Sequence, residues 1–323
     1  MHRKNLWLLI VLTALLCAFS LTASAEVSYM GMTFDESAGY IDLGNTVVRD
    51  FSELKAFLSQ FQNLKKVDMY ATEMYKDDCD RLADAFPEVE WGWLLVIPAR
   101  DHSHYIRTDS TAFSTLHSNK SVHHTSEDFE ILKYCHNLMA LDVGHNEVRS
   151  LDFLYDLPNL RILIIACNYV EDITPIETLE KLEYAELFKN KIHDISPLQN
   201  LQHLMDLNLA FNGIEDWSPL WEMTSLKRLW VYQGGNYSGG KNMTKQQVNE
   251  LKAALPDCYL DSTHYSTSGG WRGQTVKKNG KEVLIPHPHY KVLQEIFPPD
   301  QKTNPSLMYK PFEDSYPDDE EDY

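Results

Sequence analysis

Leucines recur at a fixed interval through the middle of the chain. Five of them are spaced by 22 residues: Leu138, Leu160, Leu182, Leu204 and Leu226. Each begins the frame LxxLxLxxN or a close variant of it, as in LRILIIACN and LMDLNLAFN. A period of this size, repeated five times, indicates stacked structural units. The alternation inside the frame predicts a short strand whose leucines point inward, followed by a turn.

The second half of each unit repeats as well. The segments DITPI, DISPL and DWSPL begin at Asp172, Asp194 and Asp216. Together these residues resemble the internalin-type, 22-residue class of leucine-rich repeats of secreted bacterial proteins, tightly over residues 113–235 and loosely over 40–260. The resemblance implies an α/β leucine-rich-repeat solenoid, with a curved parallel sheet on the concave side and short helices or 3₁₀ segments on the convex side.

A polar column accompanies the leucines. The frame ends in asparagine in four units: Asn146, Asn168, Asn190 and Asn212. The turn after each strand leaves backbone groups without a partner in the sheet, and an amide side chain offers both donors and an acceptor. We therefore expect these residues to form a structural ladder and not a ligand site.

The units at both ends of the array depart from the 22-residue frame. Upstream, the pattern predicts strands near 40–43, 66–70 and 90–96 that alternate with helices, the first of them capped by Asp50 and Glu53. Downstream, Thr244 and Gln247 predict a capping box that starts a helix. The expected organisation is a signal peptide at 1–25, irregular α/β repeats at 26–112, 22-residue repeats at 113–243, a C-terminal cap at 244–300 and an acidic disordered tail at 301–323.

The N-terminus has the pattern of a secretory signal peptide. A basic stretch, HRK, precedes the apolar run from Leu6 to Leu16, and Ala23-Ser24-Ala25 matches a small-x-small cleavage site. The run is shorter than the roughly 20 apolar residues that a membrane-spanning helix needs, and no later segment reaches that length. We expect cleavage near Ala25 and a secreted or cell-surface-associated protein. A retained N-terminal anchor is the alternative.

The charge of the chain limits the classes of partner that it can bind. The formal net charge is −18, and seven acids crowd the last eleven residues. Nucleic acid is excluded as a partner because phosphate binding needs a basic face.

Four cysteines remain after export: Cys79, Cys135, Cys167 and Cys258. We favour small buried hydrophobes, although two disulfides with three possible pairings stay open.

Outward-facing strand positions predict a binding surface on the concave sheet. In the last three units they combine aromatic with charged side chains, a composition that is typical of interaction hot spots. The expected ligand-binding residues are Tyr184, Glu186, Phe188, Asp206, Asn208, Phe211, Arg228, Trp230 and Tyr232. The alternative is that these aromatic side chains pack on one another or under the C-terminal cap.

Motifs for catalysis are missing from the sequence. It holds no GxGxxG, P-loop, GxSxG or HExxH motif, and the pairs His102/His104 and His287/His289 have no cysteine or carboxylate at ligand spacing. We expect no catalytic residue, metal or cofactor. The predicted function is an extracellular scaffold that binds a protein of a host or bacterial surface. A carbohydrate-binding module or cell-surface adhesin is the alternative, and an enzyme ranks third.

Overall fold

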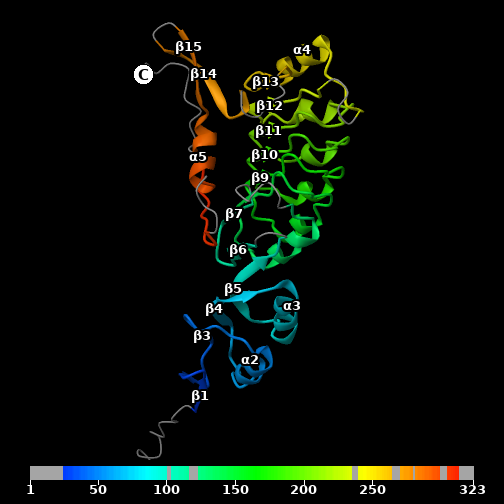
Figure 1. Cartoon of the computed structure of the whole chain (residues 1–323). Coiled ribbons are helices and arrows are strands. Elements are labelled where there is room, and N and C mark those ends of the chain that lie inside the picture. The colour runs from blue at the N-terminus through cyan, green and yellow to red at the C-terminus, as the bar shows by residue number, and fades with distance from the viewer. Residues whose placement is uncertain are drawn as a thin grey trace, which may run out of the picture.

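Residues 25–99, 103–115, 123–234, 239–263, 270–278, 281–298 and 304–312 are described by a computed structural model. They form an elongated array of strands with short helical segments along one side (Figure 1). The array contains a four-stranded sheet, β3-β4-β5-β6, followed by a seven-stranded sheet, β7 to β13. Nearly all of the predicted signal peptide, residues 1–24, lies outside the described residues.

The N-terminal section alternates strands with helices, as the sequence predicts. Strands β3, β4 and β5 are parallel, and β6 is antiparallel to β5. The elements are β1 (Glu26–Tyr29), β2 (Met32–Asp35), β3 (Tyr40–Asp42), α2 (Phe51–Leu58), β4 (Lys66–Met74), α3 (Lys76–Ala85), β5 (Glu90–Ile97) and β6 (His104–Arg107). Helix α2 begins where Asp50 accepts hydrogen bonds from the backbone N–H groups of Ser52 and Glu53.

Each regular repeat contributes one strand to the seven-stranded sheet. The strands are β7 (Ala112–Ser114), β8 (Ala140–Asp142), β9 (Ile162–Ile164), β10 (Tyr184–Glu186), β11 (Asp206–Asn208), β12 (Arg228–Trp230) and β13 (Tyr259–Asp261). All neighbours are parallel, and from β8 to β12 each residue pairs with the residue 22 positions later. Leu160, Leu182 and Leu204 are fully buried in one continuous core. The structure confirms the leucine-rich-repeat solenoid.

On the convex side, one 3₁₀ segment lies between each pair of consecutive strands from β7 to β12. The segments are η1 (Glu127–Tyr134), η2 (Asp152–Asp156), η3 (Thr174–Thr178), η4 (Ser196–Leu198) and η5 (Ser218–Glu222). The aspartate of the repeated motif accepts a hydrogen bond from the backbone N–H two residues later, in front of η3, η4 and η5. The proline that follows stands in the first turn, where a backbone donor is not needed.

The asparagine column lies between consecutive repeats. Asn190 Oδ1 accepts from the backbone N–H of Val170, and its Nδ2 donates to the carbonyl oxygens of Ile165 and Leu187 at 3.0 and 3.1 Å. Asn168 and Asn212 bond in the same way. Asn146 Oδ1 accepts from the backbone N–H of His124, and its Nδ2 donates to Thr115 Oγ1 and Val143 O. Each amide therefore joins its own turn to the preceding repeat.

The fifth repeat replaces asparagine with a glutamine one position earlier. Gln233 is fully buried, and its Nε2 donates to Leu209 O at 3.1 Å and Val231 O at 3.0 Å. The residue before each ladder asparagine has a left-handed backbone, with φ between 56° and 59°, at His145, Cys167, Lys189 and Phe211. In the fifth repeat Gly234 takes this conformation instead. The longer glutamine side chain thus reaches the same carbonyls from a shifted position.

The C-terminal part first caps the array and then turns back over it. Helix α4 (Lys245–Ala254) begins with a capping box between Thr244 and Gln247. The strands β14 (Gly273–Lys278) and β15 (Lys281–Pro286) are antiparallel, and α5 (Pro288–Ile296) then lies along the sheet, on the side opposite the 3₁₀ segments (Figure 1). We call the described residues 270–298 and 304–312 the strap.

The predicted boundary of the disordered tail at residue 301 is wrong for residues 304–312. Leu307 pairs with Ala112, and Arg107 donates its backbone N–H to Pro305 O at 2.8 Å. The reason is apolar burial, since Leu307 and Phe312 are 8% and 7% exposed. The acidic block begins only after Phe312, and residues 313–323 lie outside the described part of the chain.

All four cysteines are free thiols. Cys79 and Cys135 are buried, and Cys167 and Cys258 are half-buried. Burial raises the pKa of Cys258 to about 12, so its thiol stays protonated. Across the described ranges, we find no helix with the length and apolarity that crossing a membrane requires.

Candidate functional site on the concave face

The strap covers the concave face of the sheet with an indole ring at its centre. Trp271 is 1% exposed and lies between Tyr184 and Trp230, with ring centroids at 5.4 and 5.1 Å. Its Nε1 donates to Glu186 Oε2 at 2.9 Å. The guanidinium of Arg228 lies 4.7 Å from the indole centroid and donates to the Trp271 carbonyl oxygen. One strap residue thus contacts two repeats, those of β10 and β12.

This coverage corrects the prediction of an exposed aromatic patch. Six of the nine predicted residues are at most 4% exposed: Tyr184, Glu186, Asp206, Asn208, Arg228 and Trp230. All of them except Asn208 have contacts with the strap, which is the alternative of packing under the C-terminal cap that the sequence left open. Sequence reasoning placed the side chains on the correct face of the sheet, but it did not reveal that residues far along the chain return to that face.

The remaining three residues form a row at the edge of the covered face. Phe188, Phe211 and Tyr232 are half-buried and follow one another in consecutive repeats. Their ring centroids are 5.6 Å apart between the first two and 5.7 Å apart between the last two. We call these three residues the aromatic rim. Lys189, which follows Phe188, is exposed.

A buried polar network fastens α5 to the sheet. Asp206 Oδ2 accepts from Arg228 Nη1 at 3.0 Å and lies 2.8 Å from His289 Nδ1. The His289 ring also stacks on Phe312 at 4.2 Å. His287 accepts the backbone N–H of His289, and burial together with the nearby Arg228 lowers the pKa of His287 to about 3. The imidazole of His287 is therefore neutral at physiological pH.

Asp206, His287 and His289 also form a possible metal-ligand group. Their ligand atoms lie within 4.8 Å of one another, and all three residues are buried. Nothing in the sequence pattern indicates this grouping, because the carboxylate lies about 80 residues before the histidines. Arg228 already balances the carboxylate charge through the oxygen that faces His289. These contacts favour a structural network over a cation site.

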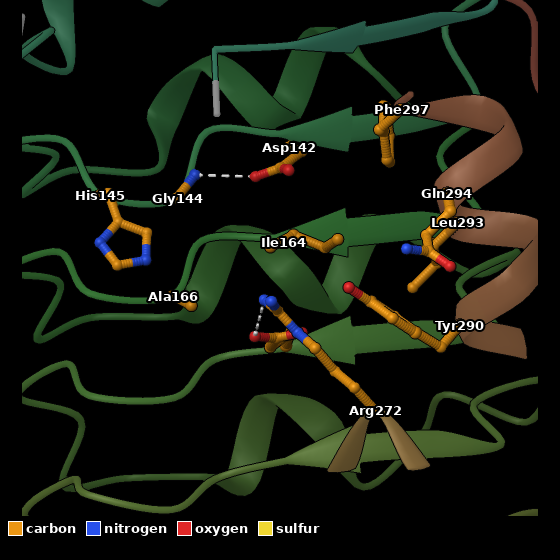
Figure 2. A pocket seen from close by; sticks show the side chains of 11 residues that line it. Asp142, Gly144, His145, Ile164, Ala166, Arg272, Tyr290, Leu293, Gln294 and Phe297 are labelled. Carbon is orange, nitrogen blue, oxygen red and sulfur yellow. Dashed lines mark hydrogen bonds and ion pairs between the residues drawn. The ribbon is translucent and has the colours of Figure 1, made fainter. Parts of the chain in front are cut away.

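A cavity of about 90 Å³ lies between α5 and strands β8 to β10 (Figure 2). Its polar lining comes from both sides, with Asp142 and Glu186 on the sheet, Arg272 at the start of the strap and Tyr290 on α5. Its apolar walls include Ile164, Ala166, Leu293 and Phe297. Figure 2 shows Arg272 and Tyr290 extending into this space from the strap.

Asp142 is a buried carboxyl group on the wall of the cavity. It accepts from the backbone N–H of Gly144 at 3.1 Å and lies 3.3 Å from Ser114 Oγ. Burial raises the pKa of Asp142 to about 7, and the nearby charge of Glu186 contributes to the rise. Gly144 leaves little room for a side chain, because a Cβ there would lie 3.3 Å from Asp142 Oδ1.

Glu186 and Arg272 face each other in the same cavity. Glu186 Oε2 accepts from Tyr184 OH at 3.1 Å and from Trp271, whereas Oε1 has an ion-pair contact with Arg272 Nη2 at 3.7 Å. The Arg272 guanidinium also lies 5.4 Å from the ring centroid of Tyr290. The cavity therefore combines two carboxyl groups with one guanidinium.

Sequence reasoning missed three of these residues. Asp142 was visible as an outward strand position, but its repeat lacks the aromatic neighbours that drew attention to the later ones. Arg272 and Tyr290 fall in the predicted C-terminal cap at 244–300, and nothing local indicates that they meet the sheet. The Trp271-Arg272 pair directly after two glycines was the available signal.

Comparisons with known proteins give structural likenesses only. No family model and no curated protein matches the chain. Internalin C2 of Listeria monocytogenes is 22% identical with a TM-score of 0.34, covering 63% of this chain and 87% of that one. The internalin InlF of the same species is 15% identical with a TM-score of 0.36, over 72% of this chain and 64% of that one.

A plant structure also resembles part of the chain. The BIR2 ectodomain of Arabidopsis thaliana is 16% identical with a TM-score of 0.26, over 35% of this chain and 58% of that one. The leucine-rich-repeat architecture rests on the repeat geometry of the chain itself: parallel strands at a 22-residue register, 3₁₀ segments outside and an asparagine column between repeats.

Proposed function

We propose that the chain is an extracellular binding scaffold, not an enzyme, and that it takes a protein partner on the aromatic rim. The main observation in support is the row of Phe188, Phe211 and Tyr232. These three half-buried aromatic side chains lie in consecutive repeats at the edge of the face that the strap covers. Aromatic side chains that are partly desolvated before binding contribute large contact areas at small entropic cost.

The aromatic rim is the part of the predicted binding surface that a partner can still reach. The other six predicted residues are enclosed by the strap, so a partner that approaches the concave side meets the rim and the adjacent Lys189 first. We therefore narrow the proposed binding surface from nine residues to three. The rigid repeat backbone beneath them holds the rings at fixed spacing, which favours a preorganised interface.

The charge of the chain favours a basic partner surface. A formal net charge of −18 attracts positively charged proteins at long range and repels acidic ones. Complementary charge of this kind raises association rates more than it raises affinity. Binding of the partner should therefore weaken as the salt concentration increases.

The proposed extracellular location rests on the N-terminal pattern. Strand β1 begins at Glu26, directly after the proposed cleavage site at Ala25, so cleavage there would leave every described strand intact. The mass of the protein recovered from the culture medium should correspond to a chain that begins at Glu26. Recovery of the uncleaved chain in the cell membrane would support the retained anchor instead.

A carbohydrate ligand is the second candidate for the rim. Aromatic rings in a row at 5.6 and 5.7 Å present apolar faces, and such faces suit the apolar sides of sugar rings. A glycan array probed with the secreted chain separates this candidate from the first.

The test compares a rim variant with a matched surface variant. The double substitution Phe188→Ala and Tyr232→Ala should abolish capture of surface proteins while the circular dichroism spectrum stays unchanged. Tyr155→Ala serves as the control, because Tyr155 is 51% exposed on the convex side in η2. Equal capture by both variants and the unaltered chain would refute the rim as the binding surface, and binding to glycans alone would favour the second candidate.

A further inference from the structure

The cavity under α5 contains a buried acceptor and a buried donor that lack hydrogen-bond partners. Glu186 is 2% exposed, and its Oε1 has no hydrogen bond to any residue that the structure describes. The same holds for Arg272 Nε. Leaving such groups unsatisfied is unfavourable, because each one loses its contact with water and gains no hydrogen bond in return. Native proteins rarely tolerate this cost without a functional reason or an ordered water.

The acidic groups in the cavity outnumber its basic group. Asp142 and Glu186 contribute two carboxyl groups, and Arg272 is the cation in contact with Glu186 at 3.7 Å. Among the described residues, Asp142 has polar contacts to Gly144 and Ser114 but no ion pair. Burial raises the pKa of Asp142 to about 7, so this carboxyl group is largely neutral below that pH while no further cation is near it. A positive group beside Asp142 would favour the ionised form, and Asp142 and Glu186 would then stabilise that group together.

The size of the cavity limits the part of a ligand that enters it to a small group. A volume of about 90 Å³ exceeds the roughly 10–15 Å³ that one water molecule needs by this measure. It is smaller than the 150 Å³ cavity that accommodates benzene in an engineered protein. The apolar walls of Ile164, Ala166 and Leu293 leave room for one small aliphatic substituent beside the polar groups.

We propose that this cavity binds an α-ammonium group together with the carbonyl or carboxylate oxygen on the adjacent carbon. The ammonium donates to Glu186 Oε1 and faces Asp142, and the oxygen accepts from Arg272 Nε. A free amino acid and the N-terminal residue of a polypeptide share this chemistry. The site lies beneath α5 and does not include the aromatic rim. Failure of the proposed protein binding at the rim would therefore leave this proposal unaffected.

Other small ligands satisfy fewer of these groups. A simple amine leaves the Arg272 Nε–H group without an acceptor. An anion such as acetate reaches Arg272 but meets the negative charge of Glu186. A sugar hydroxyl can donate and accept, yet it brings no positive charge to the two carboxyl groups. The α-ammonium with its neighbouring oxygen satisfies the donor, the acceptor and the charge together.

The test is isothermal titration calorimetry of the secreted chain with four alanine-based probes. L-alanine and L-alanyl-L-alanine amide carry the α-ammonium, as a free amino acid and as a peptide N-terminus. N-acetyl-L-alanine lacks the ammonium, and ethylamine lacks the oxygen. We expect one of the first two to bind at least about tenfold more tightly than both others, as the loss of one charge-assisted hydrogen bond implies.

Comparing the first two probes identifies the source of the ligand. Tighter binding of L-alanine indicates a free amino acid, and tighter binding of the dipeptide amide indicates a polypeptide N-terminus. Either result supports the proposal. Binding of N-acetyl-L-alanine or ethylamine at the same affinity as the ammonium-bearing probes would overturn it, as would heat changes for all four probes that match buffer alone.

Variants test whether the ammonium-bearing probes bind in this cavity. Arg272→Met and Glu186→Gln should each lower affinity by about tenfold, whereas Glu171→Gln, a change at an exposed carboxylate on the outer turn, should not. Because Glu186 also holds Trp271, hydrogen exchange of the α5 amides is measured in parallel. Arg272→Met keeps that contact, so unchanged affinity in this variant with α5 still protected would overturn the proposal.

Discussion

Trp271 Nε1 donates a hydrogen bond of 2.9 Å to Glu186 Oε2, although 85 residues separate the two in the chain. The bond connects the start of the strap to the middle of the seven-stranded sheet. Both residues are buried, at 1% and 2% exposure. A hydrogen bond to a charged group in such surroundings contributes about 1.5–3 kcal/mol, which makes Trp271 the principal attachment point of the strap.

Replacing Trp271 by phenylalanine tests this attachment. The substitution removes the Nε1–H donor and part of the buried ring, so we expect the free energy of unfolding to fall by about 2–4 kcal/mol. Hydrogen exchange should show the largest loss of protection in α5. Trp221→Phe, a change at a half-buried indole on the convex side, should leave α5 protected. An equal loss of amide protection in α5 in both variants would show that Trp271 does not attach the strap to the sheet.

Asp142→Asn should stabilise the protein in a pH-dependent manner. Burial raises the pKa of Asp142 to about 7, so the folded state binds this proton more tightly than the unfolded chain, whose aspartate pKa is about 3.9. Stability is therefore lost as the pH rises from about 4 towards 7. At about 1.4 kcal/mol per pKa unit, the loss reaches about 4 kcal/mol.

Urea unfolding at several pH values measures this effect. The amide that Asp142→Asn introduces cannot ionise, so the variant should gain stability over the original chain progressively between about pH 4 and pH 7 and hold the gain above that range. At about pH 4 the two proteins should be equally stable. Stability curves that run parallel over the whole range would contradict the placement of a neutral carboxyl group in the cavity.

Asn190→Ala should destabilise the array without altering its surface. The change leaves the Val170 backbone N–H and the carbonyl oxygens of Ile165 and Leu187 without the amide that now satisfies them. We expect a loss of about 2–4 kcal/mol in the free energy of unfolding. The exposed Asn200 offers the matched control, and Asn200→Ala should change stability by less than about 0.5 kcal/mol.

Zinc should not stabilise the group formed by Asp206, His287 and His289. Arg228 donates to the carboxylate oxygen that a metal ion would need, and a dication would place two further charges beside a buried guanidinium. Thermal unfolding with one equivalent of zinc, compared with a chelator, should give the same midpoint. A midpoint that rises and saturates at one zinc per chain would identify a metal site instead.

The repeat architecture was predictable because its signals are local. One unit of about 22 residues contains the leucines that face the core, the asparagine that joins the turns and the aspartate that precedes each 3₁₀ segment. Stacked units repeat the same short pattern, so a unit with an irregular sequence can still be assigned from its neighbours. The helix caps at Asp50 and Thr244 were equally local.

The candidate site was less predictable because it depends on long-range contacts. The side chains of Glu186 and Arg228 alternate outward as expected, but their burial is decided by Trp271, and no periodicity connects that residue to the sheet. Ile164 and Ala166 became walls of a cavity only because α5 lies above them. Sequence pattern assigned the face of each side chain, and the return of the chain determined its exposure.

The strap also links the first strand of the seven-stranded sheet to the next-to-last one. Trp271 contacts Trp230 on β12, and Leu307 pairs with Ala112 on β7. In an open solenoid each repeat contacts only its neighbours, so the terminal repeats can fray independently. Here the repeats of β7 and β12 cannot separate without detaching the same segment. The array should consequently unfold in a single cooperative transition, and the curvature of its inner surface should remain fixed when a ligand is bound.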